Sequence, residues 1–448
     1  VSAKRSKTRR FHALYGQIHR SDVLWEAWRR IKSNRGACGV DGETLEAIEE
    51  QGVEKFLEAI QAALKAGRYR PNLVRRRYIP KDDGKKQRPL GIPTVRDRVV
   101  QMAAKLVVEP IFEADFLPCS YGFRPKRNAT QALEAIREAG NSGHNFVVDG
   151  DIQAYFDSID QSRLMELIGK RISDRRVLKL IRKWLKAGVM EDGTIRETLA
   201  GTPQGGVISP LLANIYLHEL DRAWEQEHKN LGILVRYADD FVVMCETQSQ
   251  VKEARRSVEK ILTGLGLKLH PDKTRVVGLK YGREGFTFLG CEIRKCRSIQ
   301  RRPNRHFMNR WPSPRAMNNL RRRVHKLTAV RGNRARNLQE VIEGINPALR
   351  GWSNYFRSGN ADGKFNQMDG YVYRRLCQWL TRRGGQRSRF KCADWPQHRF
   401  YGSSHGLYRL QGKVSYPAQV LPLRPSVSRM WENHKYGLKG RSENRILA

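Results

Sequence analysis

Apolar residues at helical spacing dominate the N-terminal part of the chain. Residues 22–65 carry them at intervals of three and four, interrupted by the glycine-rich stretch 34–42, which predicts helices on either side of a loop. Residues 75–80 predict a strand that enters a turn at 81–84, and the periodicity of 95–112 predicts a further helix. The N-terminal part is therefore expected to be mainly helical.

Short apolar runs replace the helical pattern from residue 146 onward. Residues 146–148 predict a buried strand that ends in acidic residues, and a helix is expected from Gln161. Residues 233–237 and 241–244 predict two more strands, joined as a β-hairpin by a turn that contains two aspartates. This order predicts an α+β fold, in which helices pack on one face of an antiparallel sheet.

The composition changes after Cys291. Residues 293–339 contain no Asp or Glu but 15 Lys or Arg, and three prolines interrupt helix formation between 303 and 314, so we expect a domain boundary at 293–312. Residues 316–382 then have the periodicity of amphipathic helices that carry aromatic residues, whereas 395–448 is basic, rich in Gly and Pro, and weakly periodic.

The overall charge predicts a polyanionic partner. The 448 residues include 84 Lys and Arg against 45 Asp and Glu, which gives a net charge of +39. A globular protein does not need such an excess of positive charge to stay in solution. Binding to nucleic acid, a large polyanion, explains it. No run of about 18 apolar residues is present, so no membrane-spanning helix and no membrane partner is expected.

Cysteine usage and the first residues bear on location. The seven cysteines are scattered, without a C-x2-C pair, as in reduced intracellular proteins. We expect a cytoplasmic, bacterial and nucleoid-associated protein. The first 20 residues contain no acid, a pattern shared by RNA-contacting arms and organellar transit peptides, so an organellar location stays open.

Aspartates at strand ends form the first candidate site. Asp239 and Asp240 lie at the tip of the expected hairpin, and neighbouring strand tips can converge because adjacent strands are about 5 Å apart. Clustered carboxylates repel one another and are tolerated around a divalent cation, and hard oxygen ligands suit Mg²⁺. Asp149 and Asp151 point the same way by strand alternation, so the pattern alone leaves either as the third ligand.

Two further segments are candidates for ligand binding. Residues 201–206 contain three glycines that allow close backbone approach to a large ligand, and Ser209-Pro210 then opens a helix. Residues 81–88 place four basic side chains beside a glycine turn, and such a cluster can neutralise a triphosphate.

Eight motifs, in order, give the chain a family resemblance. They are RPLGIPTVRDRVVQ, SYGFRP, DIQAYFD, TPQGGVISPLLANI, RYADD, GLKLHPDKT, FTFLG and NPALRGWSNYF. Together they resemble the group II intron reverse transcriptases, or intron maturases, over residues 10–400. RGWSNYF after FLG distinguishes this family from retroviral and retron enzymes.

The resemblance implies the metal site. Asp151, Asp239 and Asp240 would be the metal-binding aspartates, which favours Asp151 over Asp149, and the backbone carbonyl of Ile152 would share the metal. Two Mg²⁺ ions about 3.5–4 Å apart would activate a 3′-hydroxyl and stabilise the leaving pyrophosphate. Mn²⁺ suits the same oxygen ligands.

It also implies contacts to nucleotide and nucleic acid. The dNTP-binding residues would be Lys81 and Arg88 on the triphosphate, Phe156 as the ring that excludes a ribose 2′-hydroxyl, Gln204 beside the base pair, and Lys273 as proton donor to pyrophosphate. The primer grip would be Phe288, Leu289 and Gly290. RNA or template contacts would come from Asn34, Arg35 and Gly36, and from Arg321, Arg322 and Arg323.

The implied fold is a right-hand polymerase. Residues 1–70 would be the N-terminal extension and start of the fingers, 71–292 the fingers and palm, 293–394 the helical thumb or maturase domain X, and 395–448 a basic, DNA-binding segment. Many members end in an HNH endonuclease, but no paired cysteines or HNH-like cluster are visible here, so no DNA-cleaving domain is expected.

The expected function is RNA-dependent DNA synthesis combined with binding of a group II intron RNA, which assists splicing and retromobility. The partners would be intron RNA, an RNA template with a DNA primer, target DNA and dNTPs, and the sequence leaves the oligomeric state open. Two alternatives remain: a domesticated reverse transcriptase in DNA repair or defence, and a splicing cofactor without polymerase activity.

Overall fold

The computed structural model of the chain divides into two compact units, Val1–Ser313 and Pro314–Ala448. The residues that the structure describes are 2–6, 8–80, 87–191, 194–196, 205–297, 306–329, 337–383, 396–401 and 405–415.

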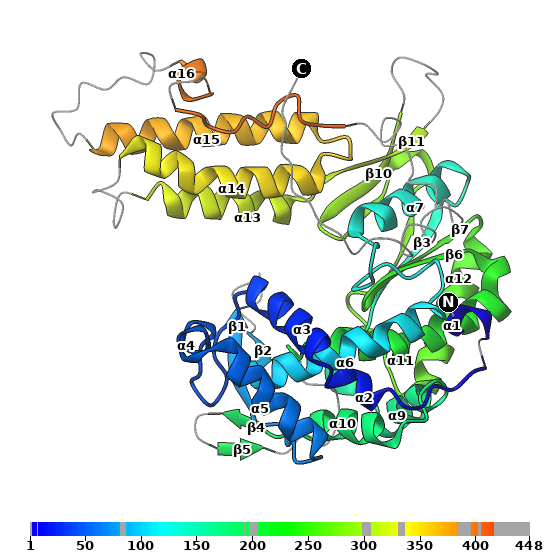
Figure 1. Cartoon of the computed structure of the whole chain (residues 1–448). Helices are drawn as coiled ribbons and strands as arrows, with labels where there is room; N and C mark the ends of the chain where they lie inside the picture. Colours follow the sequence, from blue (N-terminus) through cyan, green and yellow to red (C-terminus); the bar gives the residue numbers. More distant parts are fainter. Residues whose placement is uncertain are drawn as a thin grey trace. The chain divides into compact units, whose positions relative to one another are not determined.

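The first unit begins with α1 (Ser2–Arg5), followed by helices that pack on one another. These are α2 (Tyr15–Ile18), α3 (Ser21–Ser33), α4 (Leu45–Gln51) and α5 (Val53–Lys65), joined after two strands by α6 (Val95–Glu113). The periodic apolar residues of α3 and α5 are buried, including Trp28, Ile31 and Leu64, whereas Trp25 is 44% exposed. Helix α6 is buried over most of its circumference, and Figure 1 shows it crossing the unit behind α3.

A mixed sheet adjoins these helices, in the order β2-β1-β4-β5. Strand β1 (Val74–Pro80) pairs antiparallel with β2 (Gln87–Ile92) and parallel with β4 (Val189–Glu191), which pairs antiparallel with β5 (Thr194–Arg196). Strand β1 is therefore the expected strand at 75–80, and α6 is the expected helix at 95–112.

The second sheet is antiparallel throughout and has the order β6-β7-β3-β8. Its strands are β6 (Ile233–Tyr237), β7 (Asp240–Cys245), β3 (Phe146–Asp151) and β8 (Arg275–Gly278). Helices accompany this sheet in the chain: α7 (Ala129–Asn141), α8 (Tyr155–Ser158), α9 (Gln161–Gly169), α10 (Arg175–Leu185), α11 (Ser209–Ala223) and α12 (Gln248–Gly264). Helix α12 packs against β3 and β7. The expected α+β arrangement is confirmed.

A third sheet completes the first unit and moves the expected boundary. Strands β9 (Gly285–Phe288), β10 (Cys291–Arg297) and β11 (His306–Pro312) are antiparallel, in the order β11-β10-β9. The boundary that the composition predicts at 293–312 falls inside this sheet, because β10 and β11 pair residue by residue across the acid-free stretch. The first unit continues to Ser313.

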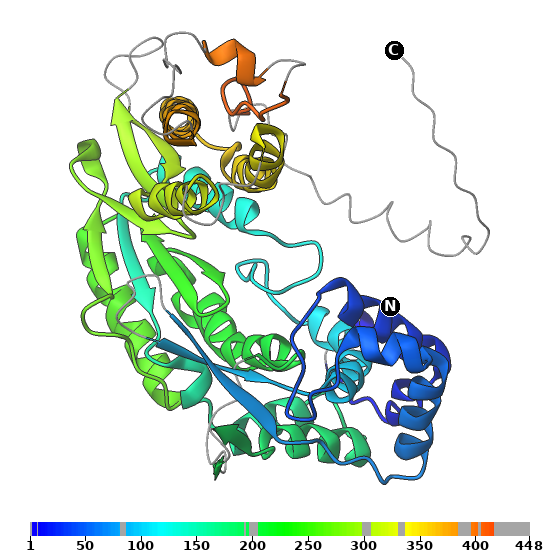
Figure 2. The same ribbon diagram turned by 90° about the vertical axis from the view of Figure 1, so that its left-hand side faces the viewer.

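The second unit is helical, as expected. Helices α13 (Pro314–Leu327), α14 (Leu338–Phe356) and α15 (Asp362–Arg383) lie side by side, lengthwise in Figure 1 and end-on in Figure 2. Val324, Ile345 and Trp379 are among the residues buried between them.

The chain after α16 (Gln397–Tyr401) is tied to the helices of this unit. The side chain of Asn346 donates to the carbonyl of Gly406 at 2.9 Å and accepts from the amide of Tyr408 at 2.7 Å. The carboxylate of Asp369 accepts from the amides of Leu410 (3.0 Å) and Gln411 (2.8 Å). Residues 405–415 therefore belong to the helical unit, although the expected basic segment begins at 395.

Candidate active site

Two aspartates that lie far apart in sequence meet across the antiparallel sheet. Asp151, the last residue of β3, is the register partner of Asp240, the first residue of β7. The turn that joins β6 to β7 contains Ala238 and Asp239, and Ala238 has a left-handed backbone with φ of 58°. All three expected carboxylates thus lie at one end of the β3–β7 pair.

The register distinguishes Asp151 from Asp149. Asp149 lies two residues back along β3, opposite Val242, and its carboxylate receives a hydrogen bond from Arg275 at 3.3 Å. Burial raises the pKa of Asp149, with the Arg275 cation opposing the shift. Asp149 therefore has a partner of its own on the neighbouring strand β8.

The carboxylates at the tip repel one another. The pKa of Asp240 is raised to about 6, first by loss of solvent around the carboxyl and then by the negative charges of Asp239 and Asp151, with a smaller contribution from Asp149. Lys273 opposes this shift, and its Nζ lies 2.5 Å from the Oδ2 of Asp151. The site therefore carries more negative charge than one lysine compensates.

This donor set fits a divalent cation in chemistry and charge. Within the described ranges, the side chains as they lie form no group of three or more His, Cys, Asp or Glu residues that could hold a metal ion. The Nζ of Lys273 instead lies against the Asp151 carboxylate. Carboxylate oxygens are the ligands that hard divalent cations prefer, and a cation among these three would relieve the repulsion that raises the pKa of Asp240.

The raised pKa predicts a pH dependence of cation binding. Below about pH 6 the Asp240 carboxyl is protonated, so a cation must displace a proton. We expect the affinity for Mn²⁺, measured by electron paramagnetic resonance without nucleic acid, to be constant above about pH 7 and to fall roughly tenfold per pH unit below 6. Asp240→Asn should bind Mn²⁺ weakly with little pH dependence. Constant affinity of the wild type down to pH 5 would remove Asp240 from the ligand set.

The residues after Asp151 leave the strand at once. The Asp151 carbonyl accepts from the amide of His270 at 2.8 Å, and Ile152, 3% exposed, forms an isolated bridge with Leu269. Ala154 then has a φ of 46° and precedes the short helix α8. The side chain of Ile152 belongs to the core, so only its backbone is available to a ligand.

Phe156 lies on α8 beside a buried tyrosine. The hydroxyl of Tyr155 donates to the carbonyl of Ala213 at 2.6 Å, which ties α8 to helix α11. The rings of Tyr155 and Phe156 are 5.4 Å apart, and Phe156 is partly buried against the core. Phe156 is thus packed against the core while the residue as a whole stays partly exposed.

The loop at 34–36 is fastened to helix α6. The Nη2 of Arg98 donates to the carbonyl of Ala37 at 2.7 Å, and a Cβ at Gly36 would lie 2.2 Å from the Nη1 of Arg98. Arg35 has a φ of 45°. Asn34 and Arg35 are exposed at the start of this loop.

The segment 288–290 is a tight turn between β9 and β10. Phe288 and Cys291 are register partners, and the two residues between them, Leu289 and Gly290, have φ values of 49° and 74°, as type I′ turns require. The Gly290 carbonyl accepts from the amide of Ser313 at 2.9 Å. Phe288 is buried, whereas Leu289 is partly exposed and Gly290 is exposed.

Three residues expected to contact the nucleotide lie wholly or partly outside the described residues. Lys81 and Gln204 lie outside the described residues, and of Arg88 only the backbone is described, paired with Ile79 in the β1–β2 hairpin. Gly205, next to Gln204, has a φ of 108°, and a Cβ there would lie 2.2 Å from the carbonyl oxygen of Gly91. The start of the 205–209 segment is therefore pressed against β2.

The three arginines expected to contact RNA lie on α13 of the second unit. Arg321 is partly buried: its guanidinium lies 5.9 Å from the ring centroid of Tyr371, and its carbonyl accepts from the tyrosine hydroxyl at 3.3 Å. Arg322 and Arg323 are exposed. The Nη2 of Arg322 donates to the Oδ1 of Asn319 on the same helix. Arg322 and Arg323 therefore form the more exposed part of this cationic surface.

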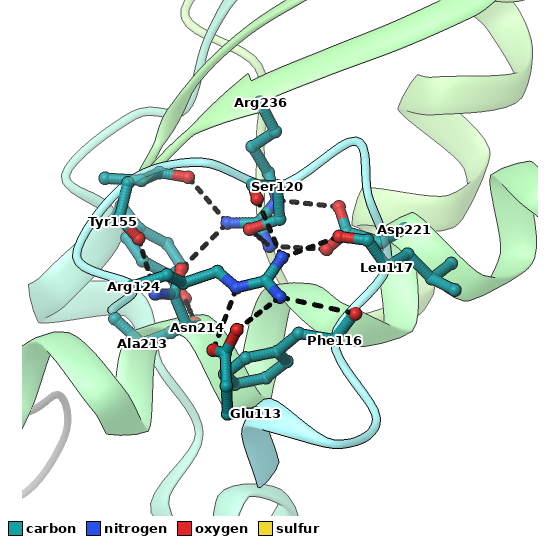
Figure 3. A network of polar contacts seen from close by, with 12 residues as sticks. Glu113, Phe116, Leu117, Ser120, Arg124, Tyr155, Ala213, Asn214, Asp221 and Arg236 are labelled. Atoms are coloured by element: carbon teal, nitrogen blue, oxygen red, sulfur yellow. Dashed lines mark hydrogen bonds and ion pairs between the residues drawn. The ribbon is translucent and has the colours of Figure 1, made fainter. Parts of the chain in front are cut away.

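A buried arginine beside the aspartates was not predicted from the sequence. Arg236, two residues before Ala238, is fully buried and pairs with Asp221 of α11 (Figure 3). The signal that could have indicated it is a charged residue inside the otherwise apolar run 233–237.

Comparison with known families agrees with this geometry. Residues 79–293 match the reverse transcriptase (RNA-dependent DNA polymerase) family, and residues 317–395 match the group II intron, maturase-specific domain. The aspartates and their sheets lie within the first match, and α13, α14 and α15 overlap the second.

Similar proteins include two bacterial relatives. Protein YkfC of Escherichia coli K12 is 36% identical over 328 residues, which are 64% of this chain and 84% of YkfC. The group II intron-encoded protein LtrA of Lactococcus lactis is 44% identical over 215 residues, 47% of this chain but only 35% of LtrA. A solved partial Cas6-RT-Cas1–Cas2 complex aligns with 56% of this chain and 41% of its own, at 26% identity and a TM-score of 0.35.

The chain belongs to the group II intron reverse transcriptase/maturase family. It contains an RNA-directed DNA polymerase domain followed by a maturase domain, and the polymerase family implies a divalent metal cofactor. None of its described helices combines the length and the apolar character needed to cross a membrane.

Proposed function

We propose that this chain copies RNA into DNA by two-metal nucleotidyl transfer, and that it binds a group II intron RNA to assist splicing and retromobility. The observation that carries the proposal is the convergence of Asp151, Asp239 and Asp240 at one end of the β3–β7 pair, inside a reverse transcriptase domain. We propose that this activity takes place in the bacterial cytoplasm, beside the nucleoid, because the relatives YkfC and LtrA come from bacteria.

The three aspartates would hold the metal together with the Ile152 carbonyl. Two bound Mg²⁺ ions would supply activation of a primer 3′-hydroxyl and charge stabilisation of pyrophosphate, and Mn²⁺ would suit the same donors. Lys273 would then act through its Nζ, which lies 2.5 Å from the Oδ2 of Asp151; the Lys273 side chain is 60% exposed. With cations bound at Asp151, this amine would be the group that gives a proton to the leaving pyrophosphate oxygen.

The remaining residues would orient the substrates. Lys81 and Arg88 would neutralise the triphosphate, Gln204 would lie beside the base pair, and the ring of Phe156 would exclude a 2′-hydroxyl. The turn of Phe288, Leu289 and Gly290 would hold the primer through its backbone. The loop of Asn34, Arg35 and Gly36 would contact the template.

The maturase domain implies intron RNA as a partner, and α13 offers a basic face for it. Its contacts would be mainly to phosphate, so affinity would depend on salt. Exposed aromatic residues such as Tyr355, 39% exposed, could stack on unpaired bases. Target DNA would be the partner of the region after residue 395.

Charge reversal on α13 should weaken RNA binding. We expect Arg322→Glu with Arg323→Glu to lower the affinity for intron RNA about tenfold at low salt and to reduce the salt slope by roughly two, because each arginine contacts one phosphate. Arg321 is left unchanged because its guanidinium packs on Tyr371.

The matched control reverses Arg255 and Arg256, which are also exposed and adjacent but lie on α12 of the first unit. Filter binding over a series of salt concentrations measures both variants. Equal losses in the two would show a net-charge effect and not a contact surface on α13.

Primer extension on an RNA template with dNTPs and Mg²⁺ tests the polymerase proposal. Extension by the wild type supports it, and its loss in Asp239→Ala assigns the site. If the wild type binds intron RNA tightly without extending a primer, the splicing-cofactor alternative replaces the proposal. Intron splicing in vitro with and without the protein tests the second activity separately.

A further inference from the structure

We propose that Arg236 is a positioning residue for the catalytic hairpin: it fixes the turn that carries Asp239 and Asp240 at the end of β3 where Asp151 lies, so that the three carboxylates can receive a divalent cation. This inference rests on the proposed function of those aspartates. It assigns a role to a buried group that touches neither metal nor substrate.

The guanidinium of Arg236 contacts four residues from three parts of the first unit: helix α11, the loop 117–124 and the turn after β6. Its Nε donates to the Oδ1 of Asp221 at 2.7 Å, and its Nη2 donates to the other carboxylate oxygen and, at 2.8 Å, to the hydroxyl of Ser120. Its Nη1 donates to the Oδ1 of Asn214 at 3.0 Å and to the carbonyl of Ala238 at 2.9 Å. Figure 3 shows this guanidinium at the centre of the polar network.

The contact to Ala238 acts on the turn itself. Ala238 has a φ of 58°, a left-handed conformation that costs a residue with a Cβ about 1 kcal/mol or more. The bond from Arg236 stabilises the carbonyl of this residue, and the next two residues are Asp239 and Asp240. The direction of both carboxylates therefore depends on a peptide that Arg236 holds.

The loop 117–124 supports the same turn from the other side. The backbone of Arg236 donates to the carbonyl of Cys119 and accepts from the amide of Tyr121, both at 2.8 Å. A Cβ on Gly122 would lie 2.3 Å from the amide nitrogen of Ala238, so the loop lies directly against the turn. Asn214 links this loop to Arg236, because its Nδ2 donates to the carbonyl of Gly122 at 2.8 Å while its Oδ1 accepts from Arg236.

Burial makes this network rigid and costly to break. The side chains of Arg236 and Asp221 are both 0% exposed. Desolvation disfavours the charge on Arg236, but the Asp221 carboxylate outweighs it and raises the pKa of the arginine above its ordinary value. A charged pair at this depth, with each guanidinium nitrogen bonded, fits a positioning role better than one of surface solubility.

Two variants separate positioning from simple stabilisation. Arg236→Met with Asp221→Leu removes both charges, so no unpaired ion remains buried, and such replacements often keep the fold. Arg236→Lys keeps a cation beside Asp221 but cannot bond the carboxylate, Asn214 and the Ala238 carbonyl together. A purely stabilising ion pair would be rescued by lysine, whereas a positioning role would not.

The primary measurement is Mn²⁺ binding by electron paramagnetic resonance on the full chain without nucleic acid. We expect both variants to bind Mn²⁺ 10- to 100-fold more weakly than the wild type, the usual effect of losing an outer support of a metal site. We further expect kcat for primer extension to fall to a similar degree, while the KM for dNTP and the affinity for RNA change less than about threefold.

The matched control is Arg171→Met with Asp115→Leu. This pair is also nearly buried, with side-chain exposures of 6% and 15%, but it holds the N-terminal segment through the carbonyls of Ser6 and Ala3. It should bind Mn²⁺ as the wild type does. If the variant Arg236→Met with Asp221→Leu fails to fold, as judged by circular dichroism, the Mn²⁺ affinity of Arg236→Lys relative to the wild type decides the question.

The outcomes distinguish this inference from the proposed function. Mn²⁺ binding at wild-type affinity in Asp239→Ala would overturn the metal-site assignment itself. Loss of binding in Asp239→Ala with wild-type binding in the Arg236 variants would overturn only the positioning role. Equal loss in the Arg236 variants and the Arg171 control would also overturn it, because general destabilisation would explain both.

Discussion

Asp239→Ala is expected to lower the rate of primer extension by more than about 10³-fold while RNA binding stays within about twofold of the wild type. Asp239 follows the left-handed residue Ala238 and adds to the charge repulsion on Asp240, so it lies within the carboxylate cluster. Removing one preorganised electrostatic group typically lowers kcat about 10²–10³-fold. Removing a metal ligand also weakens the binding of the cation whose positive charge stabilises the transition state.

The control for this result is Asp149→Asn. Asp149 is also an aspartate of β3, but it lies opposite Val242 and is bonded to Arg275. We expect it to keep extension within about threefold. Single-turnover extension measures both variants, and filter binding measures RNA affinity. Normal extension by Asp239→Ala would refute the site assignment, and equal losses in both variants would mean that total charge and not position matters.

Phe156→Ala is expected to reduce discrimination against ribonucleotides by roughly 10- to 100-fold. A ribose 2′-hydroxyl that clashes with a fixed ring is comparable to an extra group forced into a packed core, which costs about 1–3 kcal/mol. Each 1.4 kcal/mol changes the preference for deoxyribonucleotides about tenfold. The ring packs on that of Tyr155, with the two ring centroids 5.4 Å apart, and against the core, so it cannot move aside freely. The measurement is the ratio of kcat/KM for a dNTP and its rNTP.

Tyr155→Phe is the matched control for the Phe156 variant. It removes only the hydroxyl that donates to the Ala213 carbonyl and keeps the neighbouring ring. Discrimination should stay near the wild-type value, with some loss of thermal stability because a buried acceptor loses its partner. Unchanged discrimination in Phe156→Ala would place the exclusion of ribose on another residue.

Local sequence determined most of the elements near the site. Thr94 caps the N-terminus of helix α6, since its hydroxyl accepts from the amide of Asp97, and the apolar runs around Asp239 and Asp240 form β6 and β7 as predicted. These features depend on residues a few positions apart, so periodicity and turn chemistry are sufficient to predict them. The family motifs then indicated RNA-dependent DNA synthesis as the chemistry.

The domain limits show where composition fails. The acid-free stretch after Ile293 reads as a new domain, yet β10 and β11 continue the first unit to Ser313. Similarly, residues 405–415 read as part of a basic tail but are bonded to Asn346 and Asp369. Composition shows how charge is distributed along the chain, whereas a domain boundary depends on which strands and loops form backbone hydrogen bonds with one another.

The sequence by itself determined the α+β class, the acidic hairpin and the basic character that indicates nucleic acid. Only the tertiary structure decided that Asp151 faces Asp240 while Asp149 faces Val242, because strand alternation gives both aspartates the same side and the register is a long-range property. It also decided that Arg236 is buried at the base of the turn. Its partners Ser120, Asn214 and Asp221 are distant in sequence, and no local pattern encodes contacts that form only when the sheet, α11 and the 117–124 loop pack together.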